Sequence, residues 1–237
     1  MTAAILVAMP LELEAIPELV GLAPKERISG IDFYEPEPGL VLCASGVGKV
    51  NAAMAAEILC IRYGASFIVN AGVAGCTRDS LELGALVVAS EFVQHDVDTT
   101  AVGDVPGWVS TVDRIAFPAF EPELCRSLLQ AMGKTAYVGM AATGDWFVQK
   151  GGRLREVCKR FKPLILDMEA GAVAQVCLRN NVRLAAVKAV SDHVFKAEQL
   201  TEYSSSRTAL KTIGDTVVPF TKNLMRIERS GFDGQAQ

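Results

Sequence analysis

Two carboxylates stand at the two ends of one predicted helix–strand unit. Glu169 opens a run of small residues that predicts a helix, and residues 182–190 form an apolar stretch typical of a buried strand. Asp192 follows that stretch, with Ser191 beside it. Because ligands of open α/β sheets bind at the carboxyl ends of the strands, we expect these polar residues to lie at a ligand-binding edge.

A third carboxylate, Glu12, falls in the first turn after the first predicted strand, which brings it to the same edge. Taken singly, each carboxylate has an ordinary structural explanation. An acidic residue in a first helical turn complements the helix dipole, and Asp167 is a plausible N-cap beside Glu169. Three carboxylates converging on one ligand edge favour a functional site.

The elements that must position these residues alternate between strand-like and helix-like patterns. This alternation predicts an α/β fold: a three-layer αβα sandwich around a mixed, largely parallel, twisted sheet. The predicted strands are residues 3–8, 39–45, 65–70, 85–93, 135–141 and 182–190, and the predicted helices begin at Pro10, 50, 170 and 204. In the first helix Leu13, Ile16 and Val20 would form the buried stripe. Residues 71–75 and 98–114 are expected to be loops.

The domain organisation is predicted to be simple. No internal repeat, low-complexity segment or linker interrupts the chain. We expect one domain over residues 1–228, with the last helix running from 204 to about 226, and a flexible tail over residues 229–237.

Composition excludes several classes of protein. The 237 residues are 50% hydrophobic and carry a net charge of −4, so a large core is possible and no basic field for nucleic acid is present. No apolar run has transmembrane length, and the N-terminus lacks the marks of a signal peptide. The six cysteines are scattered and read as reduced core residues. We therefore expect a cytoplasmic protein that binds neither nucleic acid nor membrane.

Motifs of several cofactor and enzyme classes are missing. Gly46 and Gly48 form only half of a dinucleotide fingerprint and favour a simple strand-to-helix turn. His95, Asp96 and Asp98 lack the partner cluster that a metal site needs. Neither a nucleophile elbow nor a Walker loop occurs. We expect no metal and no cofactor.

Seven blocks of sequence resemble, in order and spacing, the nucleoside phosphorylase and nucleosidase superfamily, and most of all its 5′-methylthioadenosine/S-adenosylhomocysteine nucleosidases. The blocks are Ala8-Met9 with Glu12, SGVGKVNAA (45–53), NAGVAG (70–75), HDVD (95–98), GDWF (144–147), DMEA (167–170) and SD (191–192). The resemblance extends from Ala3 to about Arg226. It implies a nucleosidase that needs no cofactor and acts on a small-molecule nucleoside.

The resemblance also implies a role for each matching residue. Asp192 would hydrogen-bond or protonate N7 of the leaving purine, and Glu12 would deprotonate the attacking water, as acid and base do in glycoside hydrolysis. Glu169 would bind the ribose hydroxyls. The remaining expected substrate contacts are Met168 on the sugar, Phe147 and Val148 on the base, Ser191 beside Asp192, and Ala8 and Val73 near the ribose and water.

Two positions depart from the family pattern. Lys188 stands where bacterial nucleosidases typically have Arg, which keeps the charge but loses the planar fork, so this expected catalytic residue would place water differently. Val73 replaces a common Ser and removes a hydroxyl near the ribose. These differences leave the substrate preference open, including futalosine-type nucleosides and the choice between adenine and hypoxanthine.

Two other functions stay open as alternatives. A purine nucleoside phosphorylase needs an Arg before the glycine-rich stretch to hold phosphate, and residues 68–71 contain none, which favours water as the nucleophile. A non-catalytic nucleoside-binding protein on the same fold would be expected to have lost one of the carboxylates, and all three are present.

The resemblance places the 5′ substituent of the nucleoside in an apolar pocket. Val102 and Pro106 would line it, donated by the neighbouring subunit of a homodimer, together with an aromatic ring near Tyr203. Helix 50–63 would contribute to the interface; the alternative is that its many alanines pack against the sheet. An apolar pocket of this kind suits a thioether better than a phosphate.

Overall fold

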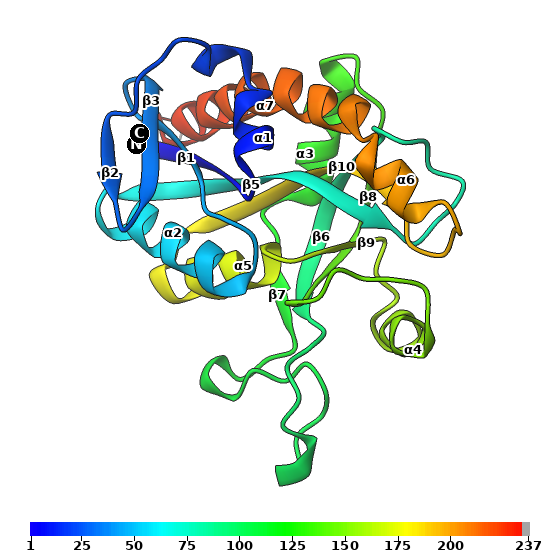
Figure 1. Cartoon of the computed structure of the whole chain (residues 1–237). Coiled ribbons are helices and arrows are strands. Elements are labelled where there is room, and N and C mark those ends of the chain that lie inside the picture. Colours follow the sequence, from blue (N-terminus) through cyan, green and yellow to red (C-terminus); the bar gives the residue numbers. More distant parts are fainter. Residues whose placement is uncertain (234–237) are drawn as a thin grey trace.

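The described residues, 1–233 of a computed structural model, form one ten-stranded mixed sheet with helices on both sides (Figure 1). The strands are β1 (Thr2–Val7), β2 (Glu26–Ile28), β3 (Ile31–Glu37), β4 (Leu40–Ala44), β5 (Ala65–Cys76), β6 (Leu86–Gln94), β7 (Ala116–Pro118), β8 (Ala136–Thr143), β9 (Ile165–Asp167) and β10 (Arg183–His193). The helices are α1 (Pro10–Glu14), α2 (Lys49–Ile61), α3 (Pro122–Ala131), α4 (Gly152–Phe161), α5 (Ala170–Asn180), α6 (Gln199–Ser204) and α7 (Arg207–Asp233). The expected α/β fold with a central mixed sheet is confirmed.

Strand β5 is the centre of the sheet, because it pairs with three others. It lies parallel to β1 and β10 and antiparallel to β9. Strand β10 also pairs with β6, and β6 with β8, which in turn pairs with β9. The strands β5, β10, β6, β8 and β9 therefore close into a ring, a feature that the sequence did not predict.

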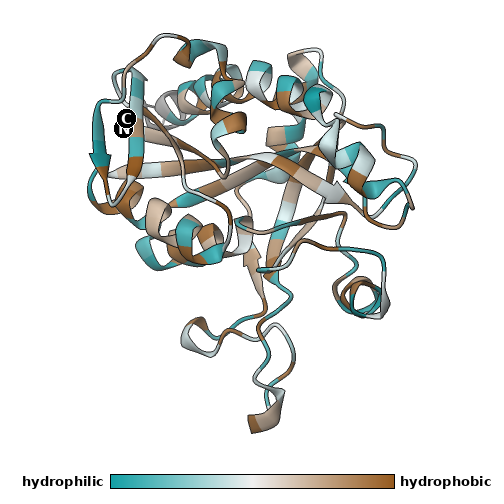
Figure 2. Cartoon of the chain, viewed as in Figure 1, coloured by the Kyte–Doolittle hydropathy of each residue, from teal (hydrophilic) through white to brown (hydrophobic). Residues whose placement is uncertain are grey.

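In the described part of the chain, three hydrophobic clusters lie between this sheet and its helices: a smaller one packs α4 against β8 and β9, and two larger ones cover the two faces of the sheet. One joins the sheet to α2 and α5, which pack on each other, and includes Ala56, Leu59 and Cys177. The other joins the opposite face to α3 and α7 and includes Leu129 and Ile213. In Figure 2, which colours the ribbon by hydropathy, the strands of the sheet are mostly apolar and the helices alternate between apolar and polar residues. The sandwich is thus built by burying apolar faces on both sides of one sheet.

Several local predictions were wrong. Helix α1 ends at Glu14 and a 3₁₀ turn begins at Pro17, so Ile16 is buried but Val20 is 81% exposed. Residues 71–75 belong to β5 because they continue its pairing with β10. Helix α7 begins after a separate α6 and continues to Asp233, so the predicted tail starts too early, and residues 234–237 lie outside the described part.

The segment between β6 and β7 is irregular, as predicted for residues 98–114. It contains only two 3₁₀ turns, Thr100–Val102 and Ser110–Val112, and in Figure 1 it projects away from the sheet and helices. Among residues 1–233, no helix combines the length and the hydropathy required to cross a membrane.

Candidate active site

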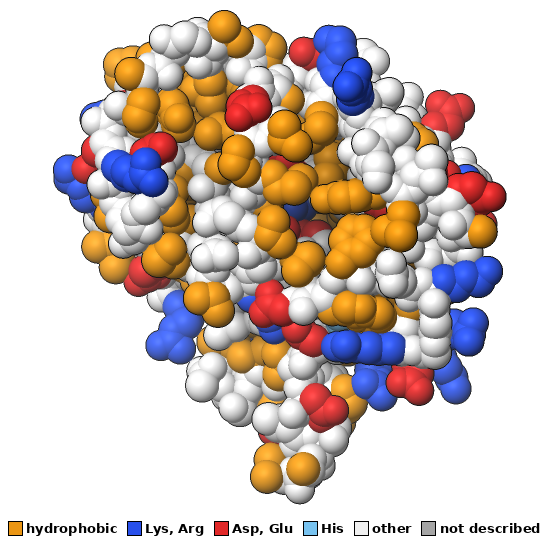
Figure 3. All heavy atoms as spheres, in the orientation of Figure 1, with side chains coloured by type: hydrophobic (Ala, Val, Ile, Leu, Met, Phe, Trp, Pro, Cys, Tyr) orange, Lys and Arg blue, Asp and Glu red, His pale blue; other side chains and the backbone are white. Residues whose placement is uncertain are grey.

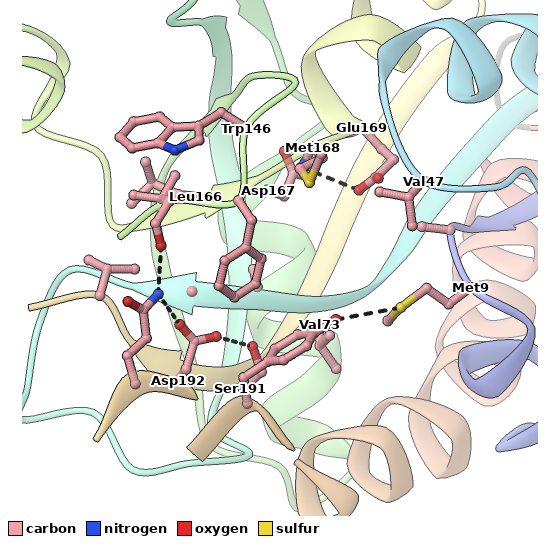
Figure 4. A pocket seen from close by; sticks show the side chains of 18 of the residues that line it. Met9, Val47, Val73, Trp146, Leu166, Asp167, Met168, Glu169, Ser191 and Asp192 are labelled. Carbon is pink, nitrogen blue, oxygen red and sulfur yellow. Dashed lines mark hydrogen bonds between the residues drawn. The ribbon is translucent and has the colours of Figure 1, made fainter. Parts of the chain in front are cut away.

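A pocket lies where β1, β5 and β10 end, and it brings the three predicted carboxylates together (Figure 4). Its lining residues are Ala8, Met9, Glu12, Val47, Val73, Ala74, Gly75, Trp146, Phe147, Val148, Leu166, Asp167, Met168, Glu169, Ser191, Asp192, Val194, Gln199 and Tyr203. Figure 3 shows the same face of the molecule, on which hydrophobic side chains gather around a hollow with acidic side chains in it. The pocket therefore combines apolar walls with a few buried charges, as small-molecule sites do.

Glu12 is fixed by three backbone N–H groups. Its Oε2 accepts hydrogen bonds from Ala8 and Met9, both at 2.9 Å, and its Oε1 accepts one from Val73 at 2.8 Å. A side chain at Gly72 would overlap Oε1, and the Gly72 backbone has φ +144°, which L side chains rarely adopt. Glycine at position 72 thus lets β5 approach the carboxylate closely enough to orient it.

Glu169 lies at the N-terminus of α5 on another wall of the pocket. Its Oε1 accepts a hydrogen bond from Gly48 at 2.9 Å. Burial, with the added repulsion of Asp167, raises the pKa of Glu169 to about 7. A carboxyl group of this pKa exchanges its proton near neutral pH.

Asp167 and Lys188 form a buried ion pair between Glu169 and the sheet. The Lys188 Nζ lies 3.1 Å from Asp167 Oδ2, and both side chains are at most 2% exposed. Asp167 also accepts hydrogen bonds from the Thr143 hydroxyl and from the N–H of Ala170, the first residue of α5. The N-cap residue of α5 is Glu169, so the prediction that Asp167 is the N-cap was wrong, although its carboxylate still pairs with an N–H of the first turn. Burial disfavours the Lys188 charge, but the carboxylates of Asp167, Glu169 and Glu12 together raise its pKa above the ordinary value.

Asp192 is the last residue but one of β10, although the sequence predicted that it follows the strand. The Ser191 hydroxyl donates to its Oδ1 at 2.6 Å, and the Gln199 amide donates to its Oδ2 at 2.9 Å. Burial raises the pKa of Asp192 above its ordinary value. Opposite it on β5, a Cβ at Gly75 would lie 3.2 Å from Oδ2 and 2.7 Å from the Val194 side chain. The position of Asp192 thus depends on the small residue facing it.

Aromatic rings close the open side of the pocket. The Phe147 and Tyr203 rings meet edge to face, with centroids 5.0 Å apart, and Phe147 is 37% exposed. The Tyr203 hydroxyl contacts the Met9 sulfur at 3.7 Å, as Figure 4 shows. A planar ligand could stack on these rings, since they present large apolar faces at the mouth.

Ten of the thirteen predicted site residues line this pocket. They are Ala8, Glu12, Val73, Phe147, Val148, Met168, Glu169, Ser191, Asp192 and Tyr203. Lys188 is not in its lining and acts from behind Asp167. Val102 and Pro106 lie in the projecting segment, where Val102 is 81% exposed.

Sequence reasoning missed several pocket residues, of which Gln199 and Asp167 make the most polar contacts. Asp167 was noticed only as a possible cap. Gln199 comes seven residues after Asp192 in a helix too short to show a period, so no sequence signal pointed to it. Met9, Val47, Trp146, Leu166 and Val194 also line the pocket without having been predicted.

The two histidines lie outside the lining. His193 bonds to Glu202 through Nδ1 at 2.9 Å and to the Leu81 carbonyl through Nε2 at 2.7 Å. His95 is buried beside Trp146, and burial lowers its pKa. Within residues 1–233 no group of three or more His, Cys, Asp or Glu side chains could hold a metal ion.

The family model described as "Phosphorylase superfamily" matches residues 2–219. The chain belongs to the phosphorylase superfamily. It is 32% identical to a 5′-methylthioadenosine/S-adenosylhomocysteine nucleosidase of Oceanobacillus iheyensis, over 94% of this chain and all of the relative. It is 34% identical to a protein of the same name from Bacillus thuringiensis, over 81% of this chain and 86% of the relative.

Solved structures of the phosphorylase superfamily have the same fold. The nucleosidase of Neisseria meningitidis in complex with methylthio-immucillin-A superposes with a TM-score of 0.85 at 28% identity, covering 94% of this chain and 99% of that one. A futalosine hydrolase of Helicobacter pylori superposes with a TM-score of 0.86 at 24% identity, covering 94% and 98%. The second likeness concerns the fold alone.

The raised pKa of Glu169 predicts a pH dependence of stability. The pKa of about 7 in the folded state exceeds the ordinary value of 4.5, so between these values the folded state holds more protons than the unfolded state. The free energy of unfolding should therefore decrease from pH 4.5 to about 7 because of this group. Urea unfolding of Glu169→Gln should show a smaller decrease than the unaltered protein.

The matched control is Glu156→Gln, which removes the same charge from an exposed position on α4. Its unfolding curve should keep the pH dependence of the unaltered protein. Identical pH dependence for Glu169→Gln and the unaltered protein would contradict the prediction.

Proposed function

We propose that this protein hydrolyses the N-glycosidic bond of a 5′-substituted adenosine, such as 5′-methylthioadenosine or S-adenosylhomocysteine, and releases adenine. The observation that carries the proposal is one pocket holding a buried acid, Asp192, and two further carboxylates, Glu12 and Glu169, without a lining cation. The fourth carboxylate of the lining, Asp167, is already paired with Lys188. The names of its relatives support the same substrate class.

Asp192 is the proposed acid. A purine leaves more readily when its ring nitrogen receives a proton or a strong hydrogen bond, and burial raises the pKa of Asp192, which favours its proton-carrying form. Ser191 holds one of its oxygens and orients the group. Phe147 would stack on the purine and the Val148 backbone would bind its edge.

Glu12 is the proposed base that activates water. Three backbone donors hold its carboxylate in one orientation, which is the arrangement that proton abstraction requires. Glu169 would bind the ribose hydroxyls beside Met168 and place negative charge near the developing oxocarbenium ion. Lys188 is proposed as a positioning residue whose charge balances these carboxylates through Asp167.

Water rather than phosphate is the proposed nucleophile. The lining of the pocket contains neither Arg nor Lys, and the buried Lys188 is already paired with Asp167. A phosphate dianion beside three carboxylates would need a guanidinium or ammonium group in direct contact. Hydrolysis therefore suits the charges of this pocket better than phosphorolysis.

We propose a homodimer that completes the 5′ end of the pocket. The projecting segment with Val102 and Pro106 exposes apolar side chains to solvent, and such surfaces are often covered by a partner. Helix α2 also exposes apolar side chains, with exposed fractions of 79% for Val50 and 72% for Ile61. Burial of both surfaces against a second copy would bring an apolar wall to the neighbouring pocket. This wall suits an alkylthio group.

The cellular setting and the extent of the domain are part of the same proposal. All six cysteines are free thiols, as expected for the reducing cytoplasm. The hydrophobic clusters share one sheet, which favours a single domain over residues 1–228.

A substrate panel tests the reaction. The purified protein should release adenine from 5′-methylthioadenosine at the same rate with and without phosphate, because water is the nucleophile. Asp192→Asn should lower kcat by about 100-fold or more, since a proton donor to the leaving base is lost. Futalosine and inosine in the panel measure the preference for the base.

Strict dependence on phosphate would show that the protein is a phosphorylase. Binding of adenosine analogues without release of base would show a non-catalytic binding protein. Full activity of Asp192→Asn towards adenosine substrates would contradict the assignment of the acid.

Gly72→Ala tests the positioning of Glu12. The new methyl group would displace Oε1, so kcat should decrease by about 100-fold while the purine still binds. The control is Gly64→Ala, which also has positive φ, +60°, but has nothing within 4 Å of the added carbon. That variant should lose stability without losing kcat. A folded Gly72→Ala protein with normal kcat would show that Glu12 is not the base.

Sedimentation velocity tests the dimer. The unaltered protein should sediment as a dimer, and Val50→Lys/Ile61→Lys should be monomeric with a higher KM for 5′-methylthioadenosine. Val20→Lys changes another exposed apolar residue, 81% exposed, and should leave the dimer intact. A fully active monomer would overturn the shared pocket.

A further inference from the structure

One buried amide closes the side of the pocket where the proposed acid lies. The Gln199 Nε2 donates to the Val148 carbonyl at 2.7 Å and to Asp192 Oδ2 at 2.9 Å. Gln199 is only 5% exposed. Because both partners are acceptors, the NH₂ end of the amide must face them. Figure 4 shows Asp192 with dashed bonds to this amide nitrogen and to Ser191.

The two acceptors together define a subsite for a single NH₂ group. A carbonyl oxygen and a carboxylate oxygen are bridged by one nitrogen that uses both of its hydrogens, and all three residues line the pocket. An exocyclic amino group on a planar base has the same two hydrogens in the same plane. It could therefore make the same pair of bonds.

We propose that Gln199 is a specificity-determining stand-in for the exocyclic amino group of the base and is displaced when an aminopurine binds. The inference rests on the proposed function, because it takes the leaving base to be a purine in this pocket. Beyond that function, the inference states how the amino group is recognised: it takes the place of the Gln199 amide.

The exchange has a physical reason on each side. Without Gln199, the buried Val148 carbonyl and the Oδ2 of Asp192 would lack a donor, and Gln199 supplies both bonds. An aminopurine would replace the two hydrogen bonds of the Gln199 amide with two of its own, so displacing the Gln199 side chain costs little free energy. A 6-oxopurine would set its oxygen against two acceptors, so the same pair rejects it.

The displacement does not require α6 to move. Gln199 is the first residue of α6, and Glu202 holds this helix on β10 by accepting bonds from the His193 N–H and ring at 2.8 and 2.9 Å. Rotation of the Gln199 side chain alone would release the subsite. Tyr203, on the same helix, can then keep its place at the mouth.

Binding of adenine and unsubstituted purine to Gln199→Met tests the proposal, with the fluorescence of Trp146 at the pocket as one readout and calorimetry as another. In the variant, adenine gains two bonds without breaking any, so its Kd should decrease by about tenfold. Purine has no group to exchange and should bind within about twofold of its original Kd. Gln175→Met removes a part-buried side-chain hydrogen bond from Gln94 outside the pocket and should change neither Kd.

Weaker or unchanged adenine binding by Gln199→Met would overturn the proposal, because it would mean that Gln199 supports the bound base. A structure of the unaltered protein with adenine gives an independent answer if the variant does not fold. Adenine N6 should occupy the position between the Val148 carbonyl and Asp192, and Gln199 still bridging them would overturn the proposal. These are binding experiments, so a protein that binds adenine by exchange but releases no base would refute only the proposed hydrolysis.

Discussion

The buried ammonium group of Lys188 is the interaction on which the rest of the pocket depends. Asp167, Glu169 and Glu12 all raise its pKa, and it pairs directly with Asp167. Carboxylates buried this closely would repel one another and be costly to desolvate without a compensating cation. Because the lysine lies behind Asp167 and outside the lining, it neutralises the site without offering a contact to an anionic ligand. The charge of Lys188 therefore permits a carboxylate-rich pocket, while its position outside the lining leaves a phosphate without a cation in direct contact.

Geometry around this charge is set by small residues of one strand. Gly72 and Gly75 of β5 face Glu12 and Asp192, and a Cβ at either position would meet the carboxylate or its neighbours. In the parallel register, Lys188 lies opposite Gly72 and Asp192 opposite Gly75. In both pairs a polar residue of β10 therefore lies beside a glycine of β5; Glu12 occupies the space at Gly72, and Asp192 with Val194 occupies the space at Gly75. The glycine-rich residues 71–75 therefore continue β5 instead of forming a turn. Glycine is needed there because the carboxylates of Glu12 and Asp192 approach the strand closely.

The sequence predicted the elements whose patterns are long and apolar, including β1, β5, β10, α2 and α5, because burial on one or both faces leaves a clear period. It missed the β2–β3 hairpin, α3 and α4, which are short or rich in charge, and it could not predict the closure of the sheet through β10 and β6. The three carboxylates were found because topology alone brings strand ends together. Gln199 was not, since its position depends on how a six-residue helix packs.

The pocket of the free protein already has its polar groups paired. Glu12 accepts three backbone hydrogen bonds, Glu169 accepts one from Gly48, and Asp192 accepts one each from Ser191 and Gln199. Most of these donors are backbone groups or a neighbouring hydroxyl, whose positions are set by the fold, so they preorganise the site. Gln199 differs, because its amide sits on a flexible side chain and satisfies two acceptors that a base could also satisfy. The contribution of this subsite to the affinity for a base is the difference between the hydrogen bonds made by the base and those made by Gln199 to the same two acceptors. Discrimination between bases then depends on which group of the base, an amino group or an oxygen, replaces the Gln199 amide. The strength of any single hydrogen bond matters less.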